Sequence, residues 1–92
     1  EAPVYEIFDS TESAGADGMQ SFLAKLKLQN APSSFDKTQV FLSAILRDKQ
    51  GKIIAGYNNF CDCPAVGSTV PVSIDVNNPP THASCDIYAA QW

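Results

Sequence analysis

Two segments of the chain alternate apolar and polar residues, and this pattern limits the folds open to it. Between residues 22 and 28, every second position is apolar, and Lys25 and Lys27 lie between them. Between residues 70 and 76, every second position is valine or isoleucine. A period of two is typical of a β-strand with one buried face. Pro71 has no backbone donor, which predicts an edge position for the second strand.

Residues 38–47 fit two secondary structures. As a helix, this stretch would place Phe41 and Ile45 on one face; as a strand, it would bury positions 40, 42, 44 and 46. The next four residues, Asp-Lys-Gln-Gly at 48–51, are typical of a type I turn with glycine where a positive φ is required. A hairpin over residues 40–57 is therefore the favoured prediction, and a helix near 36–48 is the alternative.

Several other stretches complete a predicted set of about six strands. Residues 4–8, 52–57 and 84–92 are rich in residues that favour strands. Residues 9–18 are small and acidic, which predicts a mobile loop, and 30–36 predict a second one. We expect residues 1–92 to form a single all-β domain, a small immunoglobulin-like antiparallel sandwich. The alternative is an α+β domain containing the helix near 36–48.

Composition excludes some classes of partner. The chain is acidic, with a net charge of −4, and has no cluster of lysine and arginine, so neither nucleic acid nor an anionic membrane surface is expected to bind. No apolar run approaches the roughly 20 residues of a membrane span. The first residue is Glu1 rather than methionine, and the three cysteines fit one disulfide with one thiol left over. These features favour a secreted, periplasmic or cell-surface location.

The middle of the chain resembles a known family. Residues 40–55, which contain the Asp-x-x-Gly turn, are followed by the glycine-led stretch 67–76, and this arrangement is similar to FxLyD-type and related immunoglobulin-like modules. The resemblance covers about 40 residues and implies a non-catalytic exported sandwich domain. Ala44, Leu46 and Arg47 stand where that family has its aromatic and tyrosine motif, and the cysteines are not part of the family pattern.

All the thiols and the single imidazole fall in one set: Cys61, Cys63, His82 and Cys85. The favoured interpretation is a disulfide from Cys61 or Cys63 to Cys85, because a bridge between Cys61 and Cys63 is too short along the backbone to form easily. The second interpretation is three reduced structural cysteines. The third is a zinc or copper site, since three thiolates and an imidazole make a tetrahedral set and two thiolates can bind Cu⁺.

The sequence predicts recognition rather than catalysis. His82 and Cys85 could pair as base and nucleophile only in a bent loop, and His82 is expected to be a solvated loop residue. Aromatic residues that could form an exposed platform are Tyr5, Tyr57, Phe60, Tyr88 and Trp92, and the stretch Tyr57, Asn58, Asn59 and Phe60 is the candidate ligand-binding site. We expect no catalytic residues and no cofactor, and a recognition or accessory module that binds protein or carbohydrate. The alternatives are a small metal-binding protein and a secreted inhibitor or effector-like protein.

Overall fold

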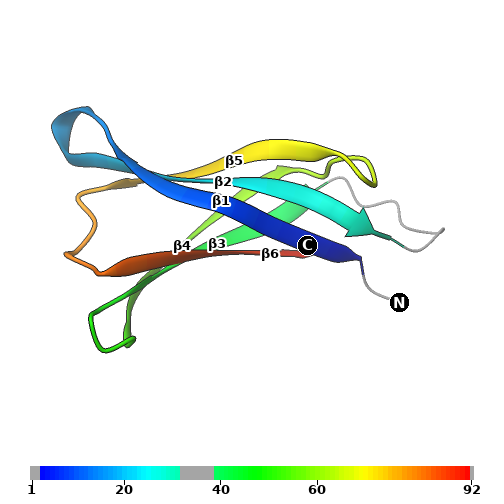
Figure 1. Cartoon of the computed structure of the whole chain (residues 1–92). Helices are drawn as coiled ribbons and strands as arrows, with labels where there is room; N and C mark the ends of the chain where they lie inside the picture. The colour runs from blue at the N-terminus through cyan, green and yellow to red at the C-terminus, as the bar shows by residue number, and fades with distance from the viewer. Residues whose placement is uncertain (1–2, 32–38, 92) are drawn as a thin grey trace.

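The chain forms two three-stranded antiparallel sheets packed face to face, as seen in a computed structural model that describes residues 3–31 and 39–91 (Figure 1). One sheet has the strand order β1-β2-β5 and the other β4-β3-β6. The strands are β1 (Val4–Ala14), β2 (Met19–Asn30), β3 (Gln39–Arg47), β4 (Ile53–Asp62), β5 (Thr69–Asn77) and β6 (Ser84–Gln91). This order matches strands A, B and E facing C′, C and F of an immunoglobulin-type sandwich. The predicted all-β, six-stranded fold is confirmed.

The core lies between the two sheets and follows from the alternation in the sequence. The central strands β2 and β3 each bury every second side chain against the other sheet. The buried apolar residues are Phe22, Ala24, Leu26, Leu28, Val40, Leu42, Ala44, Leu46, Val72, Ile74, Val76 and Ile87. Pro71 lies on β5, an edge strand as predicted. Because the core side chains use one face of each strand, the residues between them face outward.

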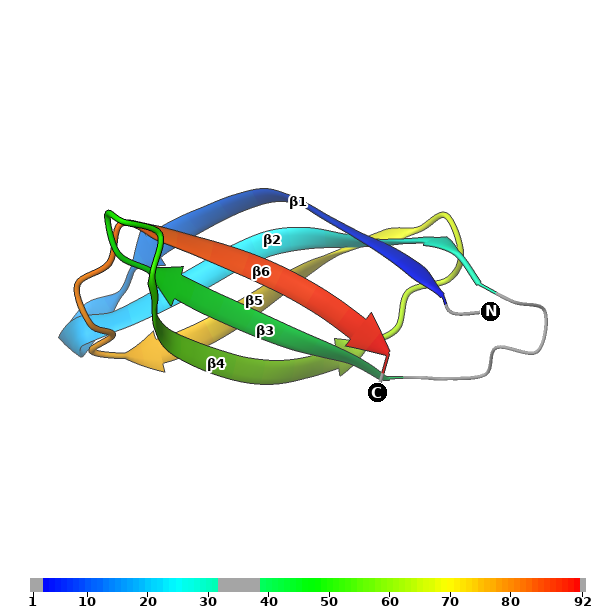
Figure 2. The ribbon, with the colours of Figure 1, turned by 90° about the horizontal axis from the view of Figure 1, so that it is seen from below.

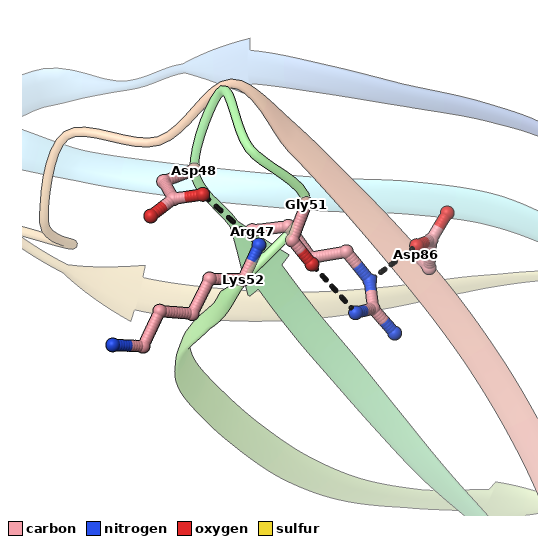
Figure 3. Close-up of polar contacts among 5 residues, drawn as sticks. All are labelled: Arg47, Asp48, Gly51, Lys52 and Asp86. Carbon is pink, nitrogen blue, oxygen red and sulfur yellow. Dashed lines mark hydrogen bonds and ion pairs between the residues drawn. The ribbon is translucent and has the colours of Figure 1, made fainter.

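The turn at residues 48–51 explains why the preceding segment, residues 39–47, is a strand rather than a helix. Gly51 has φ +82°, and the carboxylate of Asp48 accepts hydrogen bonds of 2.9 Å from the backbone N–H groups of Gln50 and Lys52. Arg47 closes the turn by donating to the Gly51 carbonyl at 3.0 Å (Figure 3). Within the described residues, 39–47 form a strand, so the alternative of a helix near 36–48 is wrong. The local turn chemistry outweighed the helical spacing of Phe41 and Ile45.

Two edge strands, β1 and β4, run well past the ends that the sequence predicted. β1 continues to Ala14, and residues Ala16–Gly18 form a short 3-10 turn before β2, so the expected mobile loop at 9–18 is mostly strand. β4 continues to Asp62 and so includes Cys61. In both cases an edge strand is held by its pairing with a central strand, a contribution that residue-by-residue propensity does not contain. The loop predicted at 30–36 falls largely outside the described residues.

The connections gather at the two ends of the sandwich. The β1–β2 turn, the β3–β4 turn and the segment between β5 and β6 share one end, which we call the hairpin end (Figures 1 and 2). The β4–β5 connection lies at the other end, where Gly67 donates to the Leu28 carbonyl of β2. No helix in the described part of the chain is long and apolar enough to cross a membrane.

Candidate functional site

The structure does not bring the four candidate metal ligands together. Cys61 pairs with Val40 at one end of β3, whereas Cys85 pairs with Leu46 near the other end. Six residues of extended strand separate these two points by about 20 Å. A disulfide needs Cα atoms within about 7 Å, so the expected bridge from Cys61 to Cys85 does not fit this register. All three cysteines are free thiols, and no described group of three or more His, Cys, Asp or Glu residues is arranged to hold a metal ion.

Cys61 and Cys63 stay together at the end opposite the hairpin end, beside Tyr5 of β1. Both thiols are half-buried and pack against the core. Burial, and then the neighbouring thiols of Cys63 and Cys61, raise the pKa of Tyr5 to about 12. Burial and the adjacent Asp62 raise the pKa of Cys61 as well. A raised pKa keeps a thiol protonated, which works against both metal ligation and nucleophilic attack.

The side chain of His82 packs against other residues of the protein and is mostly shielded from solvent. The expectation of a solvated loop residue is therefore wrong. Its side chain is only 11% exposed, and its ring packs edge-on against Phe22 with centroids 5.7 Å apart. Nδ1 lies 2.8 Å from the Pro80 carbonyl and Nε2 lies 2.9 Å from a carboxylate oxygen of Glu12. The other oxygen of Glu12 accepts a hydrogen bond from Gln20. These contacts tie the β5–β6 connection to β1 and β2 at the hairpin end.

Both ring nitrogens of His82 face acceptors, so only the protonated ring can donate to both. The Pro80 carbonyl, and then Glu12, raise the pKa of His82 against the opposing effect of burial. A raised folded-state pKa adds stability that is complete below the unfolded pKa of about 6.5 and is lost as the pH rises through the folded pKa. The contact is therefore a stabiliser at acid and near-neutral pH.

Because the pKa of His82 is raised in the folded state, the stability of the protein should depend on pH. Ion pairs of this kind contribute ~0.2–1 kcal/mol, and 1 kcal/mol shifts the melting temperature of a domain this size by about 4–8 °C. Raising the pH from about 5.5 to about 8.5 should therefore lower the melting temperature by about 1–8 °C more in the native chain than in His82→Gln. Melting curves by circular dichroism at both pH values measure the difference. An identical pH dependence in the two proteins would contradict the assignment.

Cys85 lies at the hairpin end, in a shallow cleft of about 170 Å³ lined by Ser10, Thr11, Glu12, Cys85 and Ile87. Burial, and then the carboxylates of Glu12 and Asp86, raise the pKa of Cys85 to about 11. An activated nucleophile needs the opposite shift. His82 directs its ring nitrogens at Glu12 and Pro80, and neither contact involves the sulfur of Cys85. The two residues therefore do not form a base–nucleophile pair.

The candidate ligand stretch at 57–60 is divided between the two faces of β4. Tyr57 and Asn59 pair with core residues of β3 and share their inward face. Tyr57 packs against the core, and the Asn59 amide donates to the Ser73 carbonyl of β5 at 3.0 Å. Asn58 and Phe60 point outward instead. A strand cannot present four consecutive residues on one surface, so only Asn58 and Phe60 of this stretch share the outward face of the sheet.

The outward face of the β4-β3-β6 sheet carries a cluster of aromatic and branched residues. We call this surface the aromatic face; it consists of Phe41, Ile45, Phe60 and Tyr88, with Ile53 beside the turn. Phe60 is 42% exposed and Tyr88 is 50% exposed. The rings of Phe41 and Phe60 meet edge-to-face, with centroids 5.3 Å apart at 62°. Arg47 and Asp86, 3.3 Å apart, border the cluster on the turn side (Figure 3).

The outer face of the β1-β2-β5 sheet has a different character. Polar pairs cover it: Lys25 with Asp9, Ser21 with Asp75, and Gln29 with Glu6. Phe8 and Leu23 also point outward there, but both are half-buried among these side chains. The two outer faces therefore differ, and large exposed apolar side chains concentrate on the aromatic face.

Only part of this surface was predicted from the sequence. Phe60 and Tyr88 were among the predicted platform residues, whereas Tyr5 and Tyr57 lie on the inward side and Trp92 is outside the described residues. Phe41 and Ile45 were missed, although they occupy alternate positions to the core residues of β3. That alternation was the available signal once the segment is taken as a strand.

Comparisons with protein-family models, with curated proteins and with solved structures find no match to this chain. The resemblance to FxLyD-type modules thus stays a prediction from the sequence, and the sandwich fold rests on the structure itself.

Proposed function

We propose that this chain is a non-catalytic recognition module that binds a partner protein through its aromatic face. The observation that carries the proposal is the exposure of Phe60, Tyr88 and Ile53 on one sheet of a domain whose opposite sheet is covered by polar pairs. Large exposed apolar side chains that gather on one face of a small domain typically mark an interaction site. Tyrosine and arginine are enriched among the residues that dominate binding energy, and this face carries the exposed Tyr88 and the half-buried Arg47.

The shape of the cluster favours protein over carbohydrate. Sugar rings stack on flat aromatic platforms, but Phe41 and Phe60 stand at 62° to each other and present an edge as well as a face. Ile45 and Ile53, which lie nearer the turn on the same sheet, add branched aliphatic surface without hydrogen-bonding groups. Such a mixture of aromatic and aliphatic side chains, bordered by the paired Arg47 and Asp86, is typical of the core and rim of a protein interface.

The structure also bears on the metal-binding and inhibitor alternatives. A metal site is less well supported, because the positions of Cys61 and Cys85 along β3 are separated by about 20 Å. An inhibitor or effector-like role would be a special case of partner binding and uses the same surface. Export from the cytosol and the absence of catalysis stay predictions from the sequence.

Site-specific photo-crosslinking tests the proposal. A photoreactive phenylalanine at position 60 samples the aromatic face, and the same residue at Ser73 samples the outer face of the other sheet. In an extract of the source organism, we expect a discrete protein adduct from position 60 and none from position 73. The reverse pattern, or adducts only with glycans, would contradict the proposal.

A further inference from the structure

A six-residue connection, 78–83, carries the chain from β5 in one sheet to β6 in the other across the hairpin end (Figure 1). We call this connection the strap. At its start, Asn78 donates a backbone hydrogen bond to the Gly18 carbonyl at 2.9 Å. At its end, Ala83 donates one to the Arg47 carbonyl at 2.8 Å. Both bonds join backbone groups, so neither of them depends on pH.

The side chain of His82 fastens the middle of the strap. Pro79 and Pro80 have no N–H group to donate, and among the described residues no backbone-to-backbone hydrogen bond holds residues 79–82. Every position of the strap is exposed except Pro79 and His82, which are partly buried. The imidazole ring reaches a carboxylate of β1 and packs on an aromatic ring of β2. A short segment with so few backbone bonds opens at a low cost in free energy.

We propose that the strap is a pH-sensitive switch: the protonated ring of His82 closes it onto β1 and β2, and the neutral ring lets it open. Nδ1 lies 2.8 Å from the Pro80 carbonyl oxygen, and Nε2 lies 2.9 Å from a Glu12 carboxylate oxygen. Only the protonated ring has two N–H donors, so only this form satisfies both acceptors. After deprotonation, one ring nitrogen presents a lone pair to an oxygen at the same short distance. Because that contact is repulsive, the ring must turn or withdraw, and its packing on Phe22 is lost.

The other groups around His82 do not supply a competing charge. β2 meets the ring with the uncharged side chain of Phe22. The β3–β4 turn contributes Asp48 and Lys49, which line a cleft of about 270 Å³ together with His82 and carry opposite charges. On β6, burial raises the pKa of Cys85 to about 11, so this thiol stays neutral. The pH dependence of the strap therefore rests on the ring of His82 and the carboxylate that it contacts.

Closure of the strap is favoured in acid and weakens as the pH rises through the pKa of His82. The hydrogen bond to the Pro80 carbonyl, and then Glu12, raise this pKa against the lowering effect of burial. The strap lies at the hairpin end and contains no residue of the aromatic face. Its opening is therefore independent of the partner binding proposed above.

Proton NMR of the native chain tests the strap directly, because His82 is the one histidine in the sequence and its two ring C–H protons are readily assigned. Their chemical shifts report the titration of the ring, and NOEs from them to the ring protons of Phe22 report the closed strap. From about pH 5.5 to about pH 8.5, we expect the ratio of closed to open strap to fall by up to about fivefold, the factor that an ion pair of this kind supplies. The NOEs should weaken with the same midpoint as the titration of the ring.

Two variants of β1 provide matched controls. Glu12→Gln keeps an oxygen that can accept from the ring but removes the charge, so both midpoints should move to lower pH. Glu6→Gln makes the same change on β1 where the carboxylate accepts from Gln29 instead, and both midpoints should stay as in the native chain. NOEs that persist unchanged while the ring titrates overturn the proposal. A loss of NOEs with a different midpoint also overturns it, as does a Glu12→Gln variant that titrates like Glu6→Gln.

Discussion

Replacing Phe22 by alanine is expected to lower the free energy of unfolding by about 3–5 kcal/mol, the usual cost of emptying a large aromatic site in a core. Phe22 is fully buried on β2, between the two sheets, and it also supports the ring of His82. Small domains are stable by only about 5–15 kcal/mol. Urea denaturation followed by circular dichroism should therefore show a large fall in the midpoint.

Phe60→Ala is the matched control, because it removes the same atoms from the outer surface. Its ring contacts Phe41 edge-to-face, a pair worth ~0.5–1.5 kcal/mol. The control should therefore lose clearly less stability than Phe22→Ala. Equal losses of stability in the two variants would mean that Phe60 is packed as tightly as a core residue, and this would contradict its assignment to an exposed binding surface.

Replacing Tyr88 by serine is expected to weaken binding of the protein captured from position 60 by about 30-fold. Hot-spot residues, which are enriched in tyrosine and cluster near the centre of an interface, cost about 2 kcal/mol or more when truncated, and 1.4 kcal/mol corresponds to tenfold in affinity. Tyr88 is half-exposed on the edge strand β6, beside Ser43 of β3, so its loss leaves the core unchanged. Surface plasmon resonance with the purified partner measures the dissociation constant.

Phe8→Ser is the control for this experiment. It removes an aromatic ring from the outer face of the opposite sheet, where Phe8 lies beside Lys25. We expect its affinity to match that of the native chain. If Phe8→Ser weakens binding as much as Tyr88→Ser does, the binding surface has been placed on the wrong sheet.

Much of the fold was predictable because its signals are local. The alternation around Leu26 and Ile74 identified two strands and their buried faces, and Asp48 with Gly51 identified a hairpin turn. Asp9 to Ala14 was not predicted as strand, since its small acidic residues have low strand propensity and depend on pairing with β2. Edge strands of this kind are defined by their neighbour more than by their own sequence.

The candidate sites were harder to predict because they depend on register. Cys61 lies opposite Val40 at one end of β3, and Cys85 lies opposite Leu46 near the other end. The two cysteines are therefore far apart, and no motif in the sequence indicates these pairing partners. The contact of His82 with Glu12 joins residues 70 apart in the chain. The aromatic face, by contrast, follows from the alternation of side chains along each strand. The prediction of a ligand site at 57–60 was wrong on this point, because it placed four consecutive residues on one surface.

Hydroxyl-radical footprinting of the complex shows directly whether the aromatic face is the binding surface. Oxidation of each aromatic side chain is compared by mass spectrometry with and without the captured partner. We expect protection of Tyr88 and Phe60, with Phe8 on the opposite sheet unchanged. Protection of Phe8 with Tyr88 and Phe60 still reactive would contradict it.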